Sequence, residues 1–149
     1  MPAEVRRGLL HTDILVLRRS IDASVLPEEV AISAVTLAEL AAGVHLVGGD
    51  DTAARDERAR RTDVLQRAEH EFDPIPFDAE AARAFGRICA AVRGAGRTPR
   101  RRVADLMIAA VAAVNDLPLY TTNPDDFAGL EGLLEVVEVA RPVIGDRES

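Results

Sequence analysis

The sequence predicts a single α/β domain built around a mainly parallel sheet. Short apolar runs of strand length alternate along its 149 residues with segments of helical periodicity. Strands that alternate with helices usually pair in parallel, with the helices packed on the faces of the sheet. The chain has no internal repeat and no long linker. We therefore expect one domain over residues 1–149, with a short tail over residues 142–149.

Two strands and three helices are predicted in the first half of the chain. The strands are GLLHT (8–12) and VAISAV (30–35), and the helices are DILVLRRSI (13–21), TLAELAAGVHLV (36–47) and the polar segment 52–70. Thr36 is a suitable N-cap for the second helix. The third helix interleaves arginines with acids, which is typical of a solvated helix face.

Three strands and two helices are predicted in the second half. The strands are DPIPF (73–77), LPLYTT (117–122) and LLEVVEVARPVI (133–144), and the helices are DAEAARAFGRICAAVRGAG (78–96) and VADLMIAAVAAV (103–114). Asp78 is the expected cap of the first helix, which ends at Gly94 and Gly96. The segment NPDDF (123–127) is expected to be a turn that opens a short helix.

The composition excludes several classes of function. All eighteen basic residues are arginines, so the chain cannot form a lysine Schiff base or hold a phosphate as a P-loop does. The same absence argues against phospho-receiver domains and haloacid-dehalogenase-type phosphatases, which share the fold class but use a lysine. The net charge of −7 speaks against a protein that coats nucleic acid without specificity, but it leaves a nuclease open.

Cysteine content and hydropathy indicate the compartment. Cys89 is the single cysteine, which excludes an internal disulfide framework, suits a reducing cytosol and predicts a small core residue. The N-terminal segment lacks the layout of a signal peptide, and no run reaches the roughly 18 to 20 apolar residues needed to cross a bilayer. We therefore expect a cytoplasmic protein with no membrane partner.

Asp105 is the acid that is hardest to explain as a surface residue. The other eleven residues of the helix 103–114 are all apolar, and a helix that is apolar on every side is normally buried. Burying an unpaired carboxylate costs several kcal/mol. Asp105 therefore meets a proton, an arginine, the edge of a cleft or a metal ion in the folded protein.

Three further acids, Asp13, Glu39 and Asp126, follow predicted strands. Each has a simpler interpretation: Asp13 as a helix N-cap, Asp126 as a helix cap or first-turn acid, and Glu39 as the partner of Thr36 in a capping box. Sites in parallel sheets form beyond the carboxyl ends of the strands, so we expect these acids to meet Asp105 in one cleft. Converging carboxylates need a cation, and all-oxygen ligation selects Mg²⁺ or Mn²⁺ over zinc.

The segment GRTPRRR (96–102) contains four arginines and no acid, and it directly precedes the helix of Asp105. It is interpreted either as a loop that faces the phosphates of a nucleic acid or as a solvated turn. In the first interpretation Arg100, Arg101 and Arg102 contact the phosphates of the nucleic-acid backbone.

Four segments together resemble the PIN-domain ribonucleases, and among these the VapC-type toxins of toxin–antitoxin systems. The segments are GLLHTDILV, AISAVTLAELAAGV, RRRVADLMIAAVA and LPLYTTNPDDFAGL. The resemblance implies a PIN-like α/β/α sandwich, a carboxylate site for Mg²⁺ or Mn²⁺, and cleavage of single-stranded RNA to 5′-phosphate and 3′-hydroxyl ends. It also implies a cognate VapB-type antitoxin that blocks the acidic cleft, and a homodimer or a toxin–antitoxin hetero-oligomer.

The resemblance assigns roles to residues of this chain. Glu39 and Asp105 match the acids of the second and third family motifs, and Asn123 and Asp126 match the polar and acidic positions of the fourth. These four residues are the implied catalytic residues, and the three acids are the implied metal ligands. Asn123 is also explained as a turn residue before a proline. Two threonines are further candidates for contact with RNA or the metal site: Thr12 and Thr121.

The first motif departs from the family, which usually has Leu-Leu-Asp-Thr-Ser or a close variant. Here LLHTD (9–13) places His11 at the metal-binding Asp position and Asp13 two residues later. Both are candidates for the metal site. On an extended chain Asp13 would face the same side as His11 about 7 Å away, whereas in a helix it would point elsewhere. The sequence thus supports two hypotheses: a metal-dependent endoribonuclease, or a catalytically impaired PIN-type protein that binds antitoxin or RNA without efficient cleavage.

Overall fold

A four-stranded sheet forms the centre of the computed structural model, which describes residues 4–143 except for the side chain of Arg101. In spatial order the strands are β2 (Glu29–Ala31), β1 (Arg7–Leu10), β3 (Leu119–Thr121) and β4 (Val136–Glu138). Neighbouring strands all pair in parallel, which confirms the expected sheet. The predicted strand at 73–77 is wrong, since only one bridge forms there, between Ile75 and Ser33. Pro74 and Pro76 have no N–H with which to extend it.

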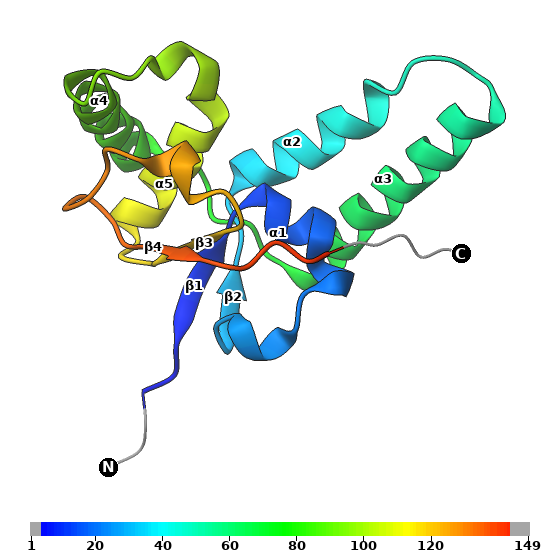
Figure 1. Cartoon of the computed structure of the whole chain (residues 1–149), viewed down its shortest axis with the longest axis horizontal. Coiled ribbons are helices and arrows are strands. Elements are labelled where there is room, and N and C mark those ends of the chain that lie inside the picture. Colours follow the sequence, from blue (N-terminus) through cyan, green and yellow to red (C-terminus); the bar gives the residue numbers. More distant parts are fainter. Residues whose placement is uncertain (1–3, 144–149) are drawn as a thin grey trace.

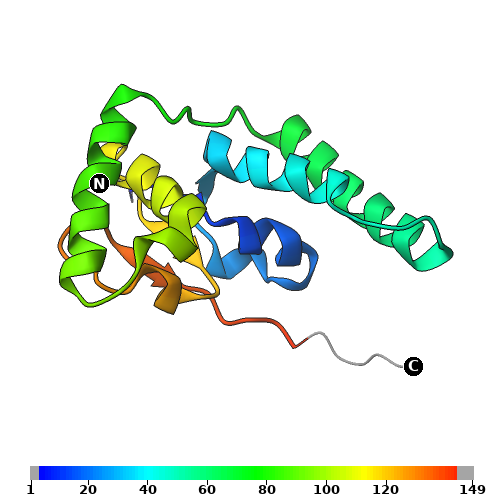
Figure 2. The same cartoon turned by 90° about the horizontal axis from the view of Figure 1, so that it is seen from above.

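Five α-helices flank the sheet within the described part of the chain: α1 (Thr12–Leu17), α2 (Ala34–His45), α3 (Thr52–Glu71), α4 (Ala79–Gly94) and α5 (Val103–Val114). Two short 3₁₀ turns also matter for the site: η3 (Pro99–Arg102) and η4 (Pro124–Phe127). Helices α4 and α5 lie together at one side of the molecule, whereas α2 and α3 form a long hairpin that projects at the other side (Figure 1). The view from above shows the same separation (Figure 2).

Neighbouring residues of the strands face two different hydrophobic cores, as the pleat of a strand requires. Leu9 and Leu119 pack with residues of α4 and α5, such as Ile88 and Leu106. Leu10 and Tyr120 pack in the other core with residues of α1, α2 and α3. The sheet is therefore covered on both faces, and the expected α/β/α sandwich is confirmed.

The starts of two helices differ from the prediction. The N-cap of α2 lies three residues earlier than expected, because Ser33 takes that position and its hydroxyl accepts the Val35 N–H at 2.8 Å. Thr36 is buried inside the helix, so the interpretation of Glu39 as the partner of Thr36 in a capping box is wrong. Helix α1 begins at Thr12 with His11 at its N-cap position. The interpretation of Asp13 as a helix cap is also wrong, and Asp13 is an acid of the first turn.

Helix α4 begins and ends as the sequence predicts. Asp78 accepts the Ala81 N–H at 2.9 Å, and Gly96 with φ of 81° lets the chain leave the helix in the left-handed conformation that glycine favours. Cys89 is half-buried in this helix and packs against the core. No helix in residues 4–143 is long and apolar enough to span a membrane. Most of the predicted tail at 142–149 lies outside the described residues.

Candidate metal centre

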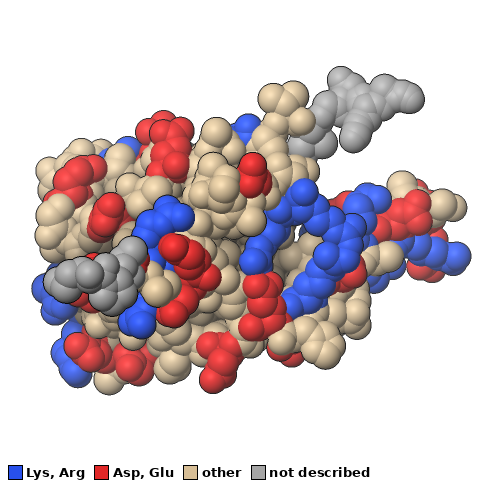
Figure 3. All heavy atoms as spheres, turned by 90° about the horizontal axis from the view of Figure 1, so that it is seen from below, with Lys and Arg blue, Asp and Glu red and all other residues tan. Residues whose placement is uncertain are grey.

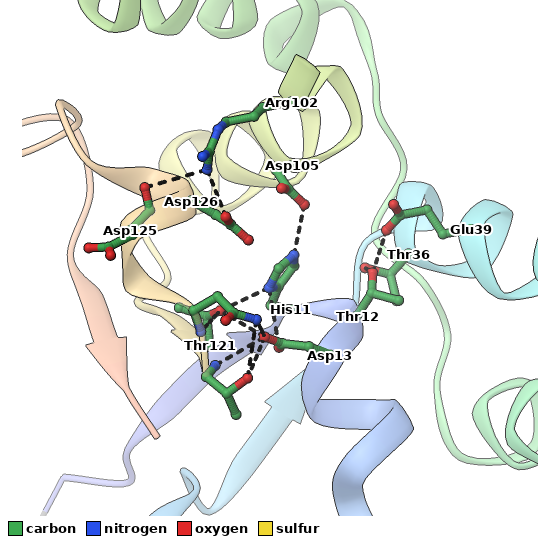
Figure 4. A network of polar contacts seen from close by, with 12 residues as sticks. His11, Thr12, Asp13, Thr36, Glu39, Arg102, Asp105, Thr121, Asp125 and Asp126 are labelled. Carbon is green, nitrogen blue, oxygen red and sulfur yellow. Dashed lines mark hydrogen bonds and ion pairs between the residues drawn. The ribbon is translucent and has the colours of Figure 1, made fainter. Parts of the chain in front are cut away.

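The ends of two neighbouring strands and the first turn of α5 bring His11, Asp105 and Asp126 together. One possible ligand atom of each lies within 4.8 Å of those of the other two. His11 directly follows β1, Asp105 is in the first turn of α5, and Asp126 is in η4 just after β3. The close view shows Asp105 and Asp126 on the same side of the His11 ring (Figure 4). This edge of the sheet is where the strand order predicts a site.

His11 is the buried member of the cluster and is fixed on several sides. It is 5% exposed, and its backbone N–H donates to the carbonyl of Tyr120 at 2.9 Å, which extends the β1–β3 ladder by one residue. Its ring packs edge-on against Phe127, with the centroids 5.0 Å apart. The Nε2 atom lies 2.8 Å from Oδ1 of Asp105. The immediate partner of the Asp105 carboxylate in the fold is therefore the imidazole of His11.

Asp13 lies at the opposite edge of the His11 ring. Its Oδ1 is 3.2 Å from Nδ1 of His11, and its Oδ2 accepts hydrogen bonds from the hydroxyl of Thr121, the N–H and hydroxyl of Thr122, and the amide of Asn123. These bonds are 2.7 to 3.2 Å long. Asp13 is therefore held away from the three possible ligand atoms, because the chain has already turned into α1.

The two acids beside His11 hold it in its charged form. Burial alone would lower the pKa of the imidazole, but hydrogen bonds and charge interactions with Asp105 and Asp13 outweigh burial and raise it to about 9. Burial likewise favours a higher pKa for Asp13, but His11 and the hydroxyls of Thr122 and Thr121 lower it to about 2. In the protein by itself, an imidazolium at neutral pH thus bridges two carboxylates.

Arg102 reaches the cluster from η3. Its Nη1 donates to Oδ1 of Asp126 at 2.7 Å and to the backbone carbonyl of Asp125 at 3.4 Å (Figure 4). Of the three arginines expected to hold RNA, Arg102 is therefore paired with a residue of the candidate site. Arg100 is exposed, and the side chain of Arg101 lies outside the described residues.

Glu39 is near the cluster but is not part of it. It accepts a hydrogen bond of 2.5 Å from the hydroxyl of Thr12, the residue after His11, and that hydroxyl also contacts Thr36 at 3.0 Å. Among the described residues, His11, Asp105 and Asp126 form the group whose ligand atoms meet, without Glu39. The structure therefore places Glu39 on the α2 side, hydrogen-bonded to the residue that follows His11 (Figure 4).

The end of β3 and the residues after it contribute the polar groups that hold Asp13. Thr121 is fully buried, with its hydroxyl close to His11, Asp13 and the Asn123 N–H, so the structure places it inside the protein rather than on a surface that RNA can reach. Thr122 was not singled out in the sequence, yet it gives Asp13 two hydrogen bonds. The run of three polar residues after a buried strand, TTN, is the signal that could have identified it.

A groove of about 590 Å³ separates α1 from α3 and lies apart from this cluster. Its rim carries four arginines and three acids, and Figure 3 shows arginine side chains gathered around a hollow on the face seen from below. These arginines form ion pairs: Arg18 with Glu71, Arg19 and Arg67 with Asp63, and Arg60 with Glu57. The interleaved charges of α3 are thus an ion-paired surface, as the sequence predicts.

Comparison with known families decides the classification, because the PIN domain model matches residues 10–133. The chain belongs to the PIN-domain family. This PIN-domain chain is 38% identical to Ribonuclease VapC5 of Mycobacterium tuberculosis over 132 residues, which are 87% of this chain and 91% of that protein. It is also 37% identical to Ribonuclease VapC8 of the same species over 112 residues, 74% of this chain and 95% of the relative. The resemblance to VapC-type PIN domains is confirmed.

Solved structures agree with this classification. A crystal structure of VapBC-5 from Mycobacterium tuberculosis, a member of the VapBC family of toxin–antitoxin systems, matches with a TM-score of 0.72 and 36% identity, over 89% of this PIN-domain chain and 97% of that chain. VapBC2 from Rickettsia felis, bound to a promoter DNA fragment, matches with a TM-score of 0.61 and 20% identity, over 89% and 98% of the two chains. The second likeness shows the fold alone.

The donors of the cluster fit a divalent cation. Two neighbouring ligands of an octahedral ion, each bound at about 2.1 Å, are about 3 Å apart, and Nε2 of His11 lies 2.8 Å from Oδ1 of Asp105. The two carboxylates supply two negative charges, which balance a dication.

Proposed function

We propose that this PIN-domain protein is the toxin of a type II toxin–antitoxin pair and a divalent-metal-dependent endoribonuclease that cleaves single-stranded RNA. The observation that carries the proposal is the convergence of His11, Asp105 and Asp126 at the carboxyl edge of the sheet, in a chain 38% identical to a protein named a ribonuclease. Mg²⁺ and Mn²⁺ are the ions expected from the sequence. The proposed compartment is the cytoplasm.

The proposed roles follow from where each side chain lies. His11, Asp105 and Asp126 hold the cation, which when bound polarises a scissile phosphate and lowers the pKa of an attacking water. Glu39, held by Thr12, is a further acid on the α2 side of the centre. Asn123 acts through Asp13, to which its amide donates a hydrogen bond.

Exposed arginine provides the proposed contact with RNA. Arg100 is exposed at η3, the turn that leads into α5 and Asp105, so a phosphate held there lies near the cluster. Binding of the RNA backbone by such residues is independent of sequence and weakens with salt. The cleavage specificity then depends on how a single strand is presented to the centre.

The proposed partner is a VapB-type antitoxin. The support is the likeness at 36% identity to the crystal structure described as a member of the VapBC family of toxin–antitoxin systems. The net charge of −7 suits a partner that presents basic groups to the acidic centre. We further propose that the chain forms a homodimer or a hetero-oligomer with this antitoxin.

A second candidate function has a specific observation in its favour. His11 pairs with Asp105 and Arg102 pairs with Asp126, so two cations of the protein itself already face the two acids. In this alternative the chain binds antitoxin or RNA but cleaves poorly, because a metal ion must displace both pairs. Restored cleavage by His11→Asp, with none by the unchanged chain in any divalent metal, would establish this alternative.

Cleavage of RNA with defined ends tests the first function. We expect a single-stranded RNA to be cut in Mn²⁺ or Mg²⁺, to give 5′-phosphate and 3′-hydroxyl ends, and to stay intact in EDTA. Asp105→Asn should reduce the rate at least about 100-fold, because it removes a metal-binding carboxylate. Asp125→Asn is the matched control, since this exposed neighbour of Asp126 is outside the cluster. Cleavage that persists in EDTA and in Asp105→Asn would contradict the proposal.

A further inference from the structure

The candidate centre differs from an all-carboxylate site in one donor and in what lies behind that donor. Nε2 of His11 meets the carboxylates of Asp105 and Asp126, so the donor set is one imidazole nitrogen and two carboxylates. Mg²⁺ prefers oxygen ligands and binds imidazole poorly, whereas imidazole suits first-row transition ions. The change of one residue therefore changes the class of ion that the centre favours.

The contacts behind the ring show which nitrogen carries a proton. Nδ1 of His11 lies 2.9 Å from the hydroxyl of Thr121 and 3.2 Å from Oδ1 of Asp13. The Thr121 hydroxyl gives its proton to Oδ2 of Asp13 and accepts the Asn123 N–H. A nitrogen between a hydroxyl oxygen and a carboxylate oxygen must donate, so Nδ1 carries a proton. In a neutral ring the lone pair is then on Nε2, at the edge that faces Asp105.

Asp13 is itself fixed, so it can fix the ring. Its Oδ2 accepts hydrogen bonds from Thr121, Thr122 and Asn123, which leaves Oδ1 directed at His11. A carboxylate behind a metal-binding imidazole orients the ring and makes the opposite nitrogen a better ligand. This arrangement also explains how an aspartate two residues beyond the family position contributes without being a ligand.

We propose that His11 and Asp13 form a carboxylate–histidine couple that presents Nε2 as a metal ligand, and that with Asp105 and Asp126 it makes a centre for a first-row transition dication such as Zn²⁺, Co²⁺ or Mn²⁺ in preference to Mg²⁺. The proposal rests on the divalent-metal function proposed above. Loading replaces the proton on Nε2, which leaves to solvent. Nε2 and Oδ1 of Asp105 are already 2.8 Å apart, whereas Asp126 exchanges its Arg102 partner for the ion.

Nitrogen-detected NMR of the unmodified chain tests the ligand directly. The protein is labelled with ¹⁵N-histidine, prepared without a polyhistidine tag, and titrated with Zn²⁺ and separately with Mg²⁺. We expect the Nε2 resonance of His11 to shift on addition of one equivalent of Zn²⁺, and to stay unchanged in Mg²⁺. The other two histidines, His45 and His70, are exposed and serve as internal controls. An unmoved Nε2 resonance in Zn²⁺, or an equal shift in Mg²⁺, would overturn the proposal.

Asp13→Asn tests the couple without removing a ligand. The new side-chain amide would direct an N–H at Nδ1, so the ring would move its proton to Nε2 and lose the lone pair that binds the metal. We expect Zn²⁺ affinity, measured by calorimetry, to fall about 10- to 100-fold, with a switched tautomer in the NMR spectrum. Asp22→Asn, which changes an exposed acid, is the matched control. Unchanged affinity in Asp13→Asn would show that Asp13 plays no part in metal binding.

His11→Asp separates this inference from the proposed function. We expect the ratio of the Mg²⁺ and Zn²⁺ dissociation constants to fall at least about tenfold in this variant, because an oxygen replaces the nitrogen. If the unchanged chain cleaves RNA in Mg²⁺ while the His11 nitrogens never respond to Zn²⁺, the metal class is wrong and the nuclease function stands. If neither protein binds any divalent ion or cleaves RNA, the proposed function itself fails.

Discussion

The two edges of the His11 ring lie in very different surroundings. The Nδ1 edge faces Asp13, whose carboxylate is 17% exposed and is bound by Thr121, Thr122 and Asn123. The Nε2 edge faces Asp105, which is 22% exposed and lies in the first turn of α5, near Asp126 of the short turn η4. The acid at one edge is held by several neutral donors, whereas the acids at the other edge are each paired with a charged side chain, His11 or Arg102.

The difference between the two edges shows how the buried His11 can contribute both to stability and to metal binding. Donors that come from the chain itself hold Asp13, so that side positions the ring. The acids on the other side have few partners, and converging carboxylates with few donors attract a cation. In the protein alone, His11 and Arg102 neutralise Asp105 and Asp126. In the proposed function a metal ion binds the two carboxylates instead.

Asp13→Ala breaks the positioning edge and should have the largest effect on stability. The variant leaves the donors of Thr121, Thr122 and Asn123 unsatisfied and removes the partner of a buried imidazolium. We expect the free energy of unfolding, measured by urea denaturation in EDTA, to fall by about 3 kcal/mol. Asp22→Ala removes an exposed carboxylate that caps a turn through Ser24, and it should cost much less. Equal losses would show that the Asp13 network adds no more than a local cap.

The pH dependence of stability tests both edges together. The pKa of His11 is raised from 6.5 to about 9, so its stabilisation is complete below about pH 6.5 and is lost as the pH rises through 9. The pKa of Asp13 is lowered from 3.8 to about 2, so its stabilisation is present above pH 3.8 and is lost as the pH falls through 2. We expect the Tm in EDTA to fall by about 5 °C between pH 6.5 and 9.

His11→Asn is the control for this pH dependence. It keeps the size and polarity of the site but removes the titrating ring, while His45 and His70 stay in place. The decline of Tm above pH 6.5 should then be much shallower than in the unchanged chain. A decline of the same size in His11→Asn would assign the effect to other groups and would contradict a charged bridge between Asp13 and Asp105.

The fold was largely predictable because its signals are local. Alternation of apolar strands and helical periods led to the parallel sheet, and Asp78 and Gly96 mark the ends of α4 as expected. The prediction is wrong where two residues are suitable as a helix cap, and where prolines leave too few backbone N–H donors for a strand. Ser33 caps α2 although the sequence also offers Thr36 for that position. The prolines on either side of Ile75 reduce the predicted strand to one bridge.

The site was predictable only in part, since its geometry depends on contacts between distant residues. That Asp126 lies near His11 follows from the ends of neighbouring parallel strands, and the lone carboxylate of the apolar helix 103–114 indicates Asp105 as a third member. That Asp13 would turn behind His11 does not follow from the sequence, because it depends on α1 starting at Thr12 and on donors that are 108 to 110 residues away in sequence. The pairing of Arg102 with Asp126 cannot be predicted either, because nothing in the sequence distinguishes Arg102 from the neighbouring arginines.

The smallest expected effects concern the arginines of η3, one of which is ion-paired within the protein while another is exposed. Arg100 is exposed, whereas Arg102 donates to Asp126 at 2.7 Å. In EDTA, Arg100→Ala should weaken binding of single-stranded RNA a few-fold and reduce the slope of log affinity against log salt by about 0.7, the value for one phosphate contact on a single strand. Arg102→Ala should leave that slope nearly unchanged, because a guanidinium paired within the protein releases no counterion from RNA.

Fluorescence anisotropy over a series of salt concentrations measures both slopes. If Arg102→Ala lowers the slope as much as Arg100→Ala does, Arg102 leaves Asp126 when RNA binds, and the acids around Nε2 then meet the RNA with only His11 as their partner.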